Sequence, residues 1–128
     1  YELPKSGDLK KNGGSVSLTI SAPASGDSNN VYVKVYNSSD ELASTVFIRK
    51  GEKATVSVPT GTTTIKVAYG SDWWGEDDMF GDEGTYTKLN NNGKSTFEFS
   101  SSRIYTLQLQ IATSNGNVGS NNVSKDAF

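Results

Sequence analysis

Apolar and polar residues alternate in short runs along most of this chain. The most regular run covers residues 105–111, where every second side chain from Tyr105 to Ile111 is apolar. A period of two predicts a β-strand with one buried face. Comparable runs predict further strands at 15–21, 31–36, 42–49, 54–58, 62–69, 85–89 and 95–100. No stretch shows apolar residues at helical spacing over three turns, so an all-β chain is expected.

Turn residues separate these runs. Pro59 and Gly61 end one strand, and an Asn-Gly pair at 92–93 marks another turn. Seven to eight short strands joined in this way predict a two-sheet antiparallel β-sandwich. A small β-barrel is the alternative that the pattern does not separate from it.

The composition changes towards both ends. Residues 1–14 are polar and broken by Pro4, Gly7 and Gly13-Gly14, which predicts a linker or an edge segment. Residues 15–112 hold the predicted sandwich. Residues 113–128 are rich in Asn, Gly and Ser, which is typical of a flexible polar tail.

One stretch, Gly70 to Gly84, interrupts the alternation. It holds both tryptophans, Trp73 and Trp74, and the only methionine, Met79. It also carries six acidic residues and no basic one: Asp72, Glu76, Asp77, Asp78, Asp82 and Glu83. We therefore expect any functional site to lie in this acidic aromatic loop.

Composition excludes several classes of function. The 128 residues suffice for one domain, and they include no cysteine and no histidine. Disulfides, zinc sites of the Cys/His kind and Ser-His or Cys-His catalysis are therefore excluded. A formal net charge of -2 without a basic aromatic stripe argues against nucleic acid as a partner.

The same composition bears on location. No apolar run approaches the roughly 18–20 residues of a membrane helix, so membrane insertion is not expected. A chain rich in Ser, Thr, Asn and Gly is typical of secreted and cell-surface β modules, which favours an extracellular or cell-surface location.

Part of the chain resembles a known type of domain. The matching pieces are Val46-Phe-Ile-Arg-Lys-Gly-Glu52, Val58-Pro-Thr-Gly-Thr62 with Ile65-Lys66, Gly70-Ser-Asp-Trp-Trp-Gly-Glu76 with Phe80-Gly81, and Tyr86-Thr-Lys88. Together they resemble a β-sandwich domain of bacterial secreted or membrane-tethered proteins. The Val-Pro-x-Gly-Thr piece is also similar to a strand-turn-strand of PEGA and carboxypeptidase-regulatory-like sandwiches, although Thr63 stands where tyrosine is common there. The resemblance covers about a third of the chain and implies an all-β accessory domain without established chemistry.

The loop composition suits a carbohydrate. Sugars stack their C–H faces on aromatic rings, and carboxylates accept hydrogen bonds from hydroxyl groups. The candidate ligand-binding residues are Trp73, Trp74, Asp72, Glu76, Asp77 and Asp78. Adjacent residues of an extended chain point to opposite sides, so one indole at most would enter the core. The alternative is a packed lid, in which the indoles and Phe80 seal one end of the sandwich.

The same carboxylates bear on two other chemistries. Calcium prefers six to eight oxygen ligands, but the Asp-x-Asp-x-Asp-Gly pattern of an EF-hand is absent, so calcium is only a candidate and no cofactor is predicted. A glycosidase needs two carboxylates across a cleft, which a small sandwich rarely forms. The prediction is a non-catalytic module of a larger or surface-attached polypeptide that binds a glycan through the loop. A structural spacer or a protein-docking module of a cell-surface protein is the alternative.

Overall fold

The architecture is taken from a computed structural model. It describes residues 4–22, 30–75, 79–81, 84–90, 96–100, 104–108 and 119–122. This part of the chain contains nine strands and no α-helix. Their bounds are β1 (Val16–Ser21), β2 (Asn30–Tyr36), β3 (Leu42–Ile48), β4 (Lys53–Val58), β5 (Gly61–Gly70), β6 (Thr85–Asn90), β7 (Phe97–Phe99), β8 (Tyr105–Gln108) and β9 (Gly119–Asn122).

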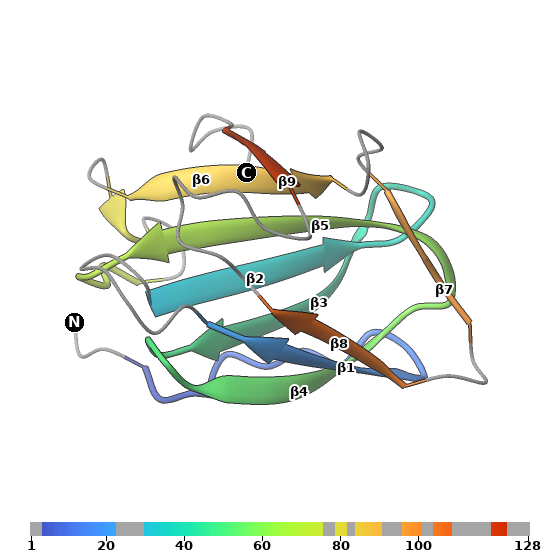
Figure 1. Ribbon diagram of the computed structural model, residues 1–128, viewed down its shortest axis with the longest axis horizontal. Coiled ribbons are helices and arrows are strands. Elements are labelled where there is room, and N and C mark those ends of the chain that lie inside the picture. Colours follow the sequence, from blue (N-terminus) through green and yellow to red (C-terminus); the bar gives the residue numbers. More distant parts are fainter. Residues whose placement is uncertain are drawn as a thin grey trace.

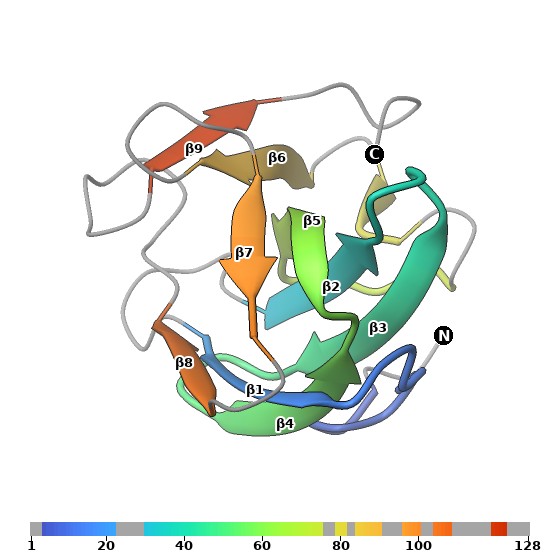
Figure 2. The ribbon, with the colours of Figure 1, turned by 90° about the vertical axis from the view of Figure 1, so that its right-hand side faces the viewer.

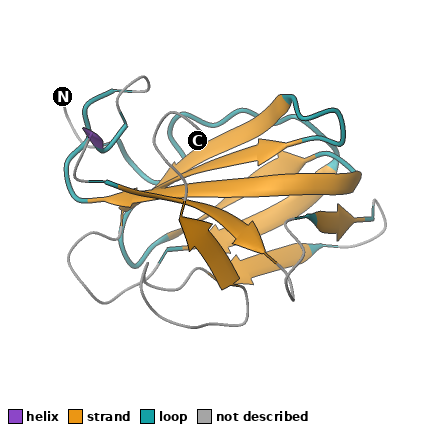
Figure 3. Cartoon of the chain, turned by 90° about the horizontal axis from the view of Figure 1, so that it is seen from above, coloured by secondary structure: helices purple, strands orange, loops and turns teal. Residues whose placement is uncertain are grey.

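The strands form two stacked sheets (Figure 1). The smaller sheet has the order β4-β1-β8, and the larger has the order β3-β2-β5-β6-β9. The sheets do not close into a barrel, so the predicted sandwich is confirmed. Figure 3 shows, from above, that strands make up nearly all of the regular structure.

Neighbouring strands are antiparallel with one exception. β8 runs parallel to β1, with Leu18 opposite Tyr105 and Ile20 opposite Leu107. β7 pairs with the beginning of β5 and crosses one end of the sandwich from one sheet toward the other (Figure 2). The eight strands that alternation predicts all occur, with bounds shifted by a few residues at most where the chain is described.

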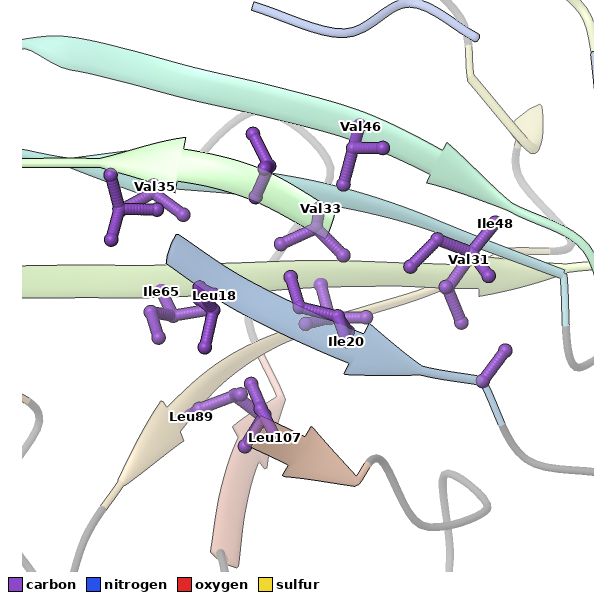
Figure 4. Packing of buried hydrophobic residues seen from close by; sticks show 14 of the residues in the cluster. Leu18, Ile20, Val31, Val33, Val35, Val46, Ile48, Ile65, Leu89 and Leu107 are labelled. Carbon is purple, nitrogen blue, oxygen red and sulfur yellow. The ribbon is translucent and has the colours of Figure 1, made fainter. Parts of the chain in front are cut away.

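The main core lies between the two sheets and consists mainly of the inward residues of the alternating strands (Figure 4). β2 contributes Val31, Val33 and Val35, and β1 contributes Leu18 and Ile20, all nearly without exposure. β-Branched residues dominate because their side chains pack well on a pleated sheet. The alternating faces of β2 leave Tyr32, Lys34 and Tyr36 on the outer side of the larger sheet.

The segment before β1 lies along the edge of β3. The amides of Gly7 and Lys11 donate to the carbonyls of Phe47 and Thr45, at 2.8 and 2.9 Å. The amides of Phe47 and Thr45 donate in return to Asp8 and Lys11. Gly13 then donates to Ser57 of β4, so the segment spans the edges of both sheets.

The last strand, β9, is one that alternation does not predict. Gly119–Asn122 lies in the polar segment 113–128, and it pairs with β6 from Thr87 to Asn90. A strand that holds to an edge through backbone hydrogen bonds needs no apolar period, so its side chains give no signal. The remainder of that segment lies outside the described residues.

Candidate functional site

The acidic aromatic loop folds back over the outer face of the larger sheet. Its described part, residues 70–75, 79–81 and 84, is called the lid below. The lid and four strands bury a second apolar cluster, separate from the main core, which we call the lid cluster. Its members are Tyr32, Phe47, Ala68, Trp73, Met79, Phe80 and Tyr86, with Leu9 packed against them.

Trp73 is the centre of the lid cluster. Its ring meets those of Tyr32, Phe47 and Phe80 at centroid distances of 5.4, 5.1 and 5.3 Å. The interplanar angles of 71–76° are edge-to-face arrangements, which aromatic quadrupoles favour. Only 7% of Trp73 is exposed. This indole is therefore a packing residue, with no open face for a sugar.

Two glycines make room for Phe80. A Cβ at Gly70, the last residue of β5, would lie 2.5 Å from the Phe80 Cβ. A Cβ at Gly84, just before β6, would lie 2.7 Å from the same atom. The Phe80 ring thus rests on the bare backbone at the two ends of the loop. This close approach explains why the loop begins and ends with glycine.

Trp74 is the exposed aromatic residue of the lid. It is 53% exposed, whereas its neighbour Trp73 is buried. A tight backbone turn holds it: the Trp74 amide donates to the Met79 carbonyl at 2.7 Å, and the Met79 amide donates to Gly75 at 2.6 Å. The edge of its indole lies over Gly81, where a Cβ would come within 3.2 Å of the ring.

The geometry of this turn requires left-handed backbone at three positions. Gly75 and Gly81 have φ of 94° and 68°, and Met79 has φ of 54°. Glycine adopts this conformation without strain, but methionine does not, so the buried Met79 side chain stabilises an otherwise costly conformation. The Tyr86 hydroxyl further fixes the turn by donating to the Gly81 carbonyl at 2.8 Å.

The structure places the predicted site residues in different environments. Trp73 is packed, while Trp74 and Asp72 are exposed. Glu76, Asp77 and Asp78 lie outside the described residues. Among the residues that the structure describes, no three acidic side chains come together as cation ligands. Calcium therefore remains a prediction about the undescribed carboxylates.

The position of the lid differs from the sequence-based alternative of an end seal. Trp73 and Phe80 cover the outer face of the larger sheet, on residues of β2, β3, β5 and β6. The sequence alone does not mark the residues beneath them as site residues. The feature of the sequence that indicates these residues is a large apolar side chain on the outward face of a strand. Phe47, between the inward Val46 and Ile48, is an example.

A row of lysines borders the lid cluster on the same outer face. Lys34 of β2 is opposite Lys66 of β5, which in turn is opposite Lys88 of β6. All three are half-buried. We call these residues the lysine row. Register alone brings them together, since they are separated by 32 and 22 positions in the chain.

Tyrosine rings accompany the lysine row. The Lys66 Nζ lies 4.8 Å from the centroid of the Tyr36 ring, and the Lys34 Nζ lies 5.9 Å from that of Tyr32. Burial, and secondarily the negative charge of Asp40, raises the pKa of the Tyr36 hydroxyl above its usual value. Tyr36 is therefore neutral at physiological pH and presents its ring face to the cation.

No helix in the described part of the chain combines the length and the apolar character that crossing a membrane requires. Comparisons with protein-family models, with curated proteins and with solved structures found no match to this chain.

Proposed function

We propose that this chain is a non-catalytic β-sandwich module that binds a glycan through Trp74. The observation that carries the proposal is the contrast between two adjacent indoles. Trp73 is packed, whereas Trp74 is 53% exposed on a turn closed by two backbone hydrogen bonds. An exposed indole offers a large, rigid ring face with few rotatable bonds, which favours a binding role.

The contacts that the structure gives around Trp74 support this role. The backbone hydrogen bonds, the Gly81 contact and the Tyr86 hydroxyl orient the Trp74 ring before any ligand arrives. A pre-oriented ring loses little conformational freedom on binding, which improves affinity. Asp72, two positions earlier and exposed, supplies a carboxylate that accepts hydrogen bonds from sugar hydroxyls.

The other parts of the proposal come from the sequence. The absence of histidine and cysteine supports a non-catalytic role. The composition and the resemblance to bacterial secreted or membrane-tethered domains support an extracellular or cell-surface location. Glu76, Asp77 and Asp78 are proposed as further acceptors on the basis of sequence alone.

A second candidate is a protein-docking module, because a lone exposed indole also serves as an anchor in protein interfaces. The two candidates differ in the ligand that Trp74 contacts. A glycan needs one flat ring with neighbouring hydrogen-bond acceptors, whereas a protein interface needs a wider apolar patch. In the described part of the chain the other exposed large apolar residues are Leu42 and Ile104, and neither belongs to the lid.

Affinity electrophoresis through gels that contain single polysaccharides tests the proposal. The wild-type chain is expected to be retarded by at least one polysaccharide, and Trp74→Ala is expected to abolish the retardation with the fold intact. Leu42→Ala removes an exposed apolar residue elsewhere and is expected to bind like the wild type. Equal retardation of all three proteins, or of none, would overturn the assignment to Trp74.

A further inference from the structure

The lysine row is an unusual arrangement for a sheet. Side chains directly opposite each other in antiparallel strands have Cβ atoms about 4.5–5.5 Å apart, and like charges at such positions are destabilising. Lys34–Lys66 and Lys66–Lys88 are two such pairs on three adjacent strands. The chain as a whole has a net charge of -2, whereas the lysine row places three positive charges side by side. The row is therefore a local positive patch on an acidic protein.

Two of the three lysine side chains lie over tyrosine rings on this face of the sheet. Lys66 lies over the ring of Tyr36, and Lys34 lies over that of Tyr32. Lys34 and Lys66 also interact with other groups of the protein. A ligand would therefore meet two ammonium groups that are already oriented, those of Lys34 and Lys66. Its anionic groups would replace some of the contacts that these lysines make within the protein.

Each member of the lysine row lies next to a strand residue of the lid cluster. Each lysine is two residues from a member of the lid cluster on the same strand and the same face: Tyr32 on β2, Ala68 on β5 and Tyr86 on β6. Two residues of a strand span about 6.6 Å. The Tyr32 ring, which approaches Lys34, also packs against Trp73, the neighbour of Trp74.

We propose that the ligand is an acidic polysaccharide, whose carboxylate or sulfate groups lie on Lys34, Lys66 and Lys88. This inference rests on the proposed function, since it names the class of glycan that the Trp74 site takes. Adjacent strands lie about 4.8 Å apart, which is close to the length of one sugar unit in an extended polysaccharide. A polymer that crosses the strands thus spans the lysine row with about two to three of its sugar units and places anionic groups on it, with a sugar face left for Trp74.

Matched polymers test whether binding requires negative charge on the polysaccharide. Polygalacturonate and its fully methyl-esterified form share a backbone and differ in carboxylate charge. Dextran sulfate and dextran share a backbone and differ in sulfate groups. The expected result is binding of polygalacturonate, dextran sulfate or both, with much weaker binding of the neutral partner. The pair that shows the difference identifies carboxylate or sulfate as the recognised group. A random-sequence DNA duplex serves as an anion without exposed sugar faces.

Matched variants test the residues. The lysine-row variant combines Lys34→Gln, Lys66→Gln and Lys88→Gln. It is expected to bind the acidic polymer about tenfold to hundredfold more weakly than the wild type. The control combines Lys10→Gln, Lys50→Gln and Lys53→Gln, which removes the same charge from exposed positions elsewhere. The control is expected to bind like the wild type. Thermal unfolding of both triple variants verifies that each is folded.

The outcomes separate this inference from the proposed function. The wild type could bind a neutral glycan, with binding lost in Trp74→Ala and unchanged in the lysine-row variant. That result would overturn the inference of an acidic ligand and retain the proposed function. Loss of acidic-polymer binding in the lysine-row variant but not in Trp74→Ala would retain the lysine row and overturn the role of Trp74. DNA binding as tight as that of the acidic glycan would overturn the glycan assignment, and no binding to any polymer would overturn both proposals.

Discussion

The Phe80 side chain packs directly on the backbone of Gly70, so closely that a Cβ at Gly70 would lie 2.5 Å from the Phe80 Cβ. Gly70 ends β5 on the outer face of the larger sheet, and Phe80 belongs to the lid. This contact joins the lid to the sheet at the point where the loop leaves it.

Gly70→Ala is therefore expected to destabilise the protein by displacing Phe80. Overpacking of this kind costs about 1–3 kcal/mol in the free energy of unfolding. Urea unfolding followed by tryptophan fluorescence measures the change, and the emission of the folded state is expected to shift to the red as Trp73 becomes more exposed. Ser71→Ala, at the exposed next position, is the control and is expected to change the free energy by less than about 0.5 kcal/mol. A fully stable Gly70→Ala protein would show that the lid tolerates this shift.

The two tryptophans are expected to respond differently to truncation. Trp73→Ala removes the centre of three aromatic pairs and is expected to cost about 3–5 kcal/mol of stability, which unfolds a marginal domain. Trp74→Ala is expected to cost less than about 1 kcal/mol, since more than half of the side chain is exposed. Denaturant titrations of both variants provide the comparison.

Acrylamide quenching gives an independent measurement of the same contrast. Trp73→Phe leaves Trp74 as the only indole and is expected to give readily quenched, red-shifted emission. Trp74→Phe leaves Trp73 and is expected to give blue-shifted, poorly quenched emission. Similar quenching of the two single-tryptophan proteins would contradict the burial that distinguishes them.

Tyr69 is expected to make stability depend on alkaline pH. Burial in the main core raises its pKa to about 12, from about 10 in an unfolded chain. The neutral hydroxyl is thus favoured in the folded state, and this contribution to stability is complete below about pH 10. It is lost between pH 10 and 12 at about 1.4 kcal/mol per pH unit, because only the unfolded chain ionises there.

The matched variant is Tyr69→Phe, which has no group to titrate at this position. The free energy of unfolding of the wild type relative to Tyr69→Phe is expected to be constant from about pH 8 to about pH 10 and to fall at higher pH. A difference that stays constant up to about pH 11 would mean that Tyr69 ionises at its ordinary pKa.

Gly13 is expected to be required for the edge segment before β1. A Cβ at this position would lie 2.9 Å from the Cα of Ala43 and closer still to its carbonyl group. Gly13→Ala is therefore expected to detach the segment from β3 and to cost about 1–3 kcal/mol of stability. Hydrogen exchange at the amides of Thr45 and Phe47, which donate to Lys11 and Asp8, is expected to accelerate. The exposed Lys10→Ala serves as control, and unchanged exchange in Gly13→Ala would contradict the close approach.

Period-two alternation determined the strands of the main core, because a side chain on a strand alternates between two faces and only one face of each sheet meets the other sheet. It also located the acidic aromatic loop, since two adjacent tryptophans between glycines have no place in that alternation. The burial of one indole at most was likewise expected from the geometry of an extended chain.

The tertiary structure decided which indole is packed and where the loop lies. The lid cluster joins residues from β2, β3, β5 and β6 to the lid, and no local pattern encodes which outward side chains become neighbours across a sheet. The lysine row depends on the same cause, because the register of β2, β5 and β6 aligns Lys34, Lys66 and Lys88. The parallel pairing of β1 with β8 and the addition of β9 depend on backbone hydrogen bonds between distant segments, which side-chain alternation does not specify.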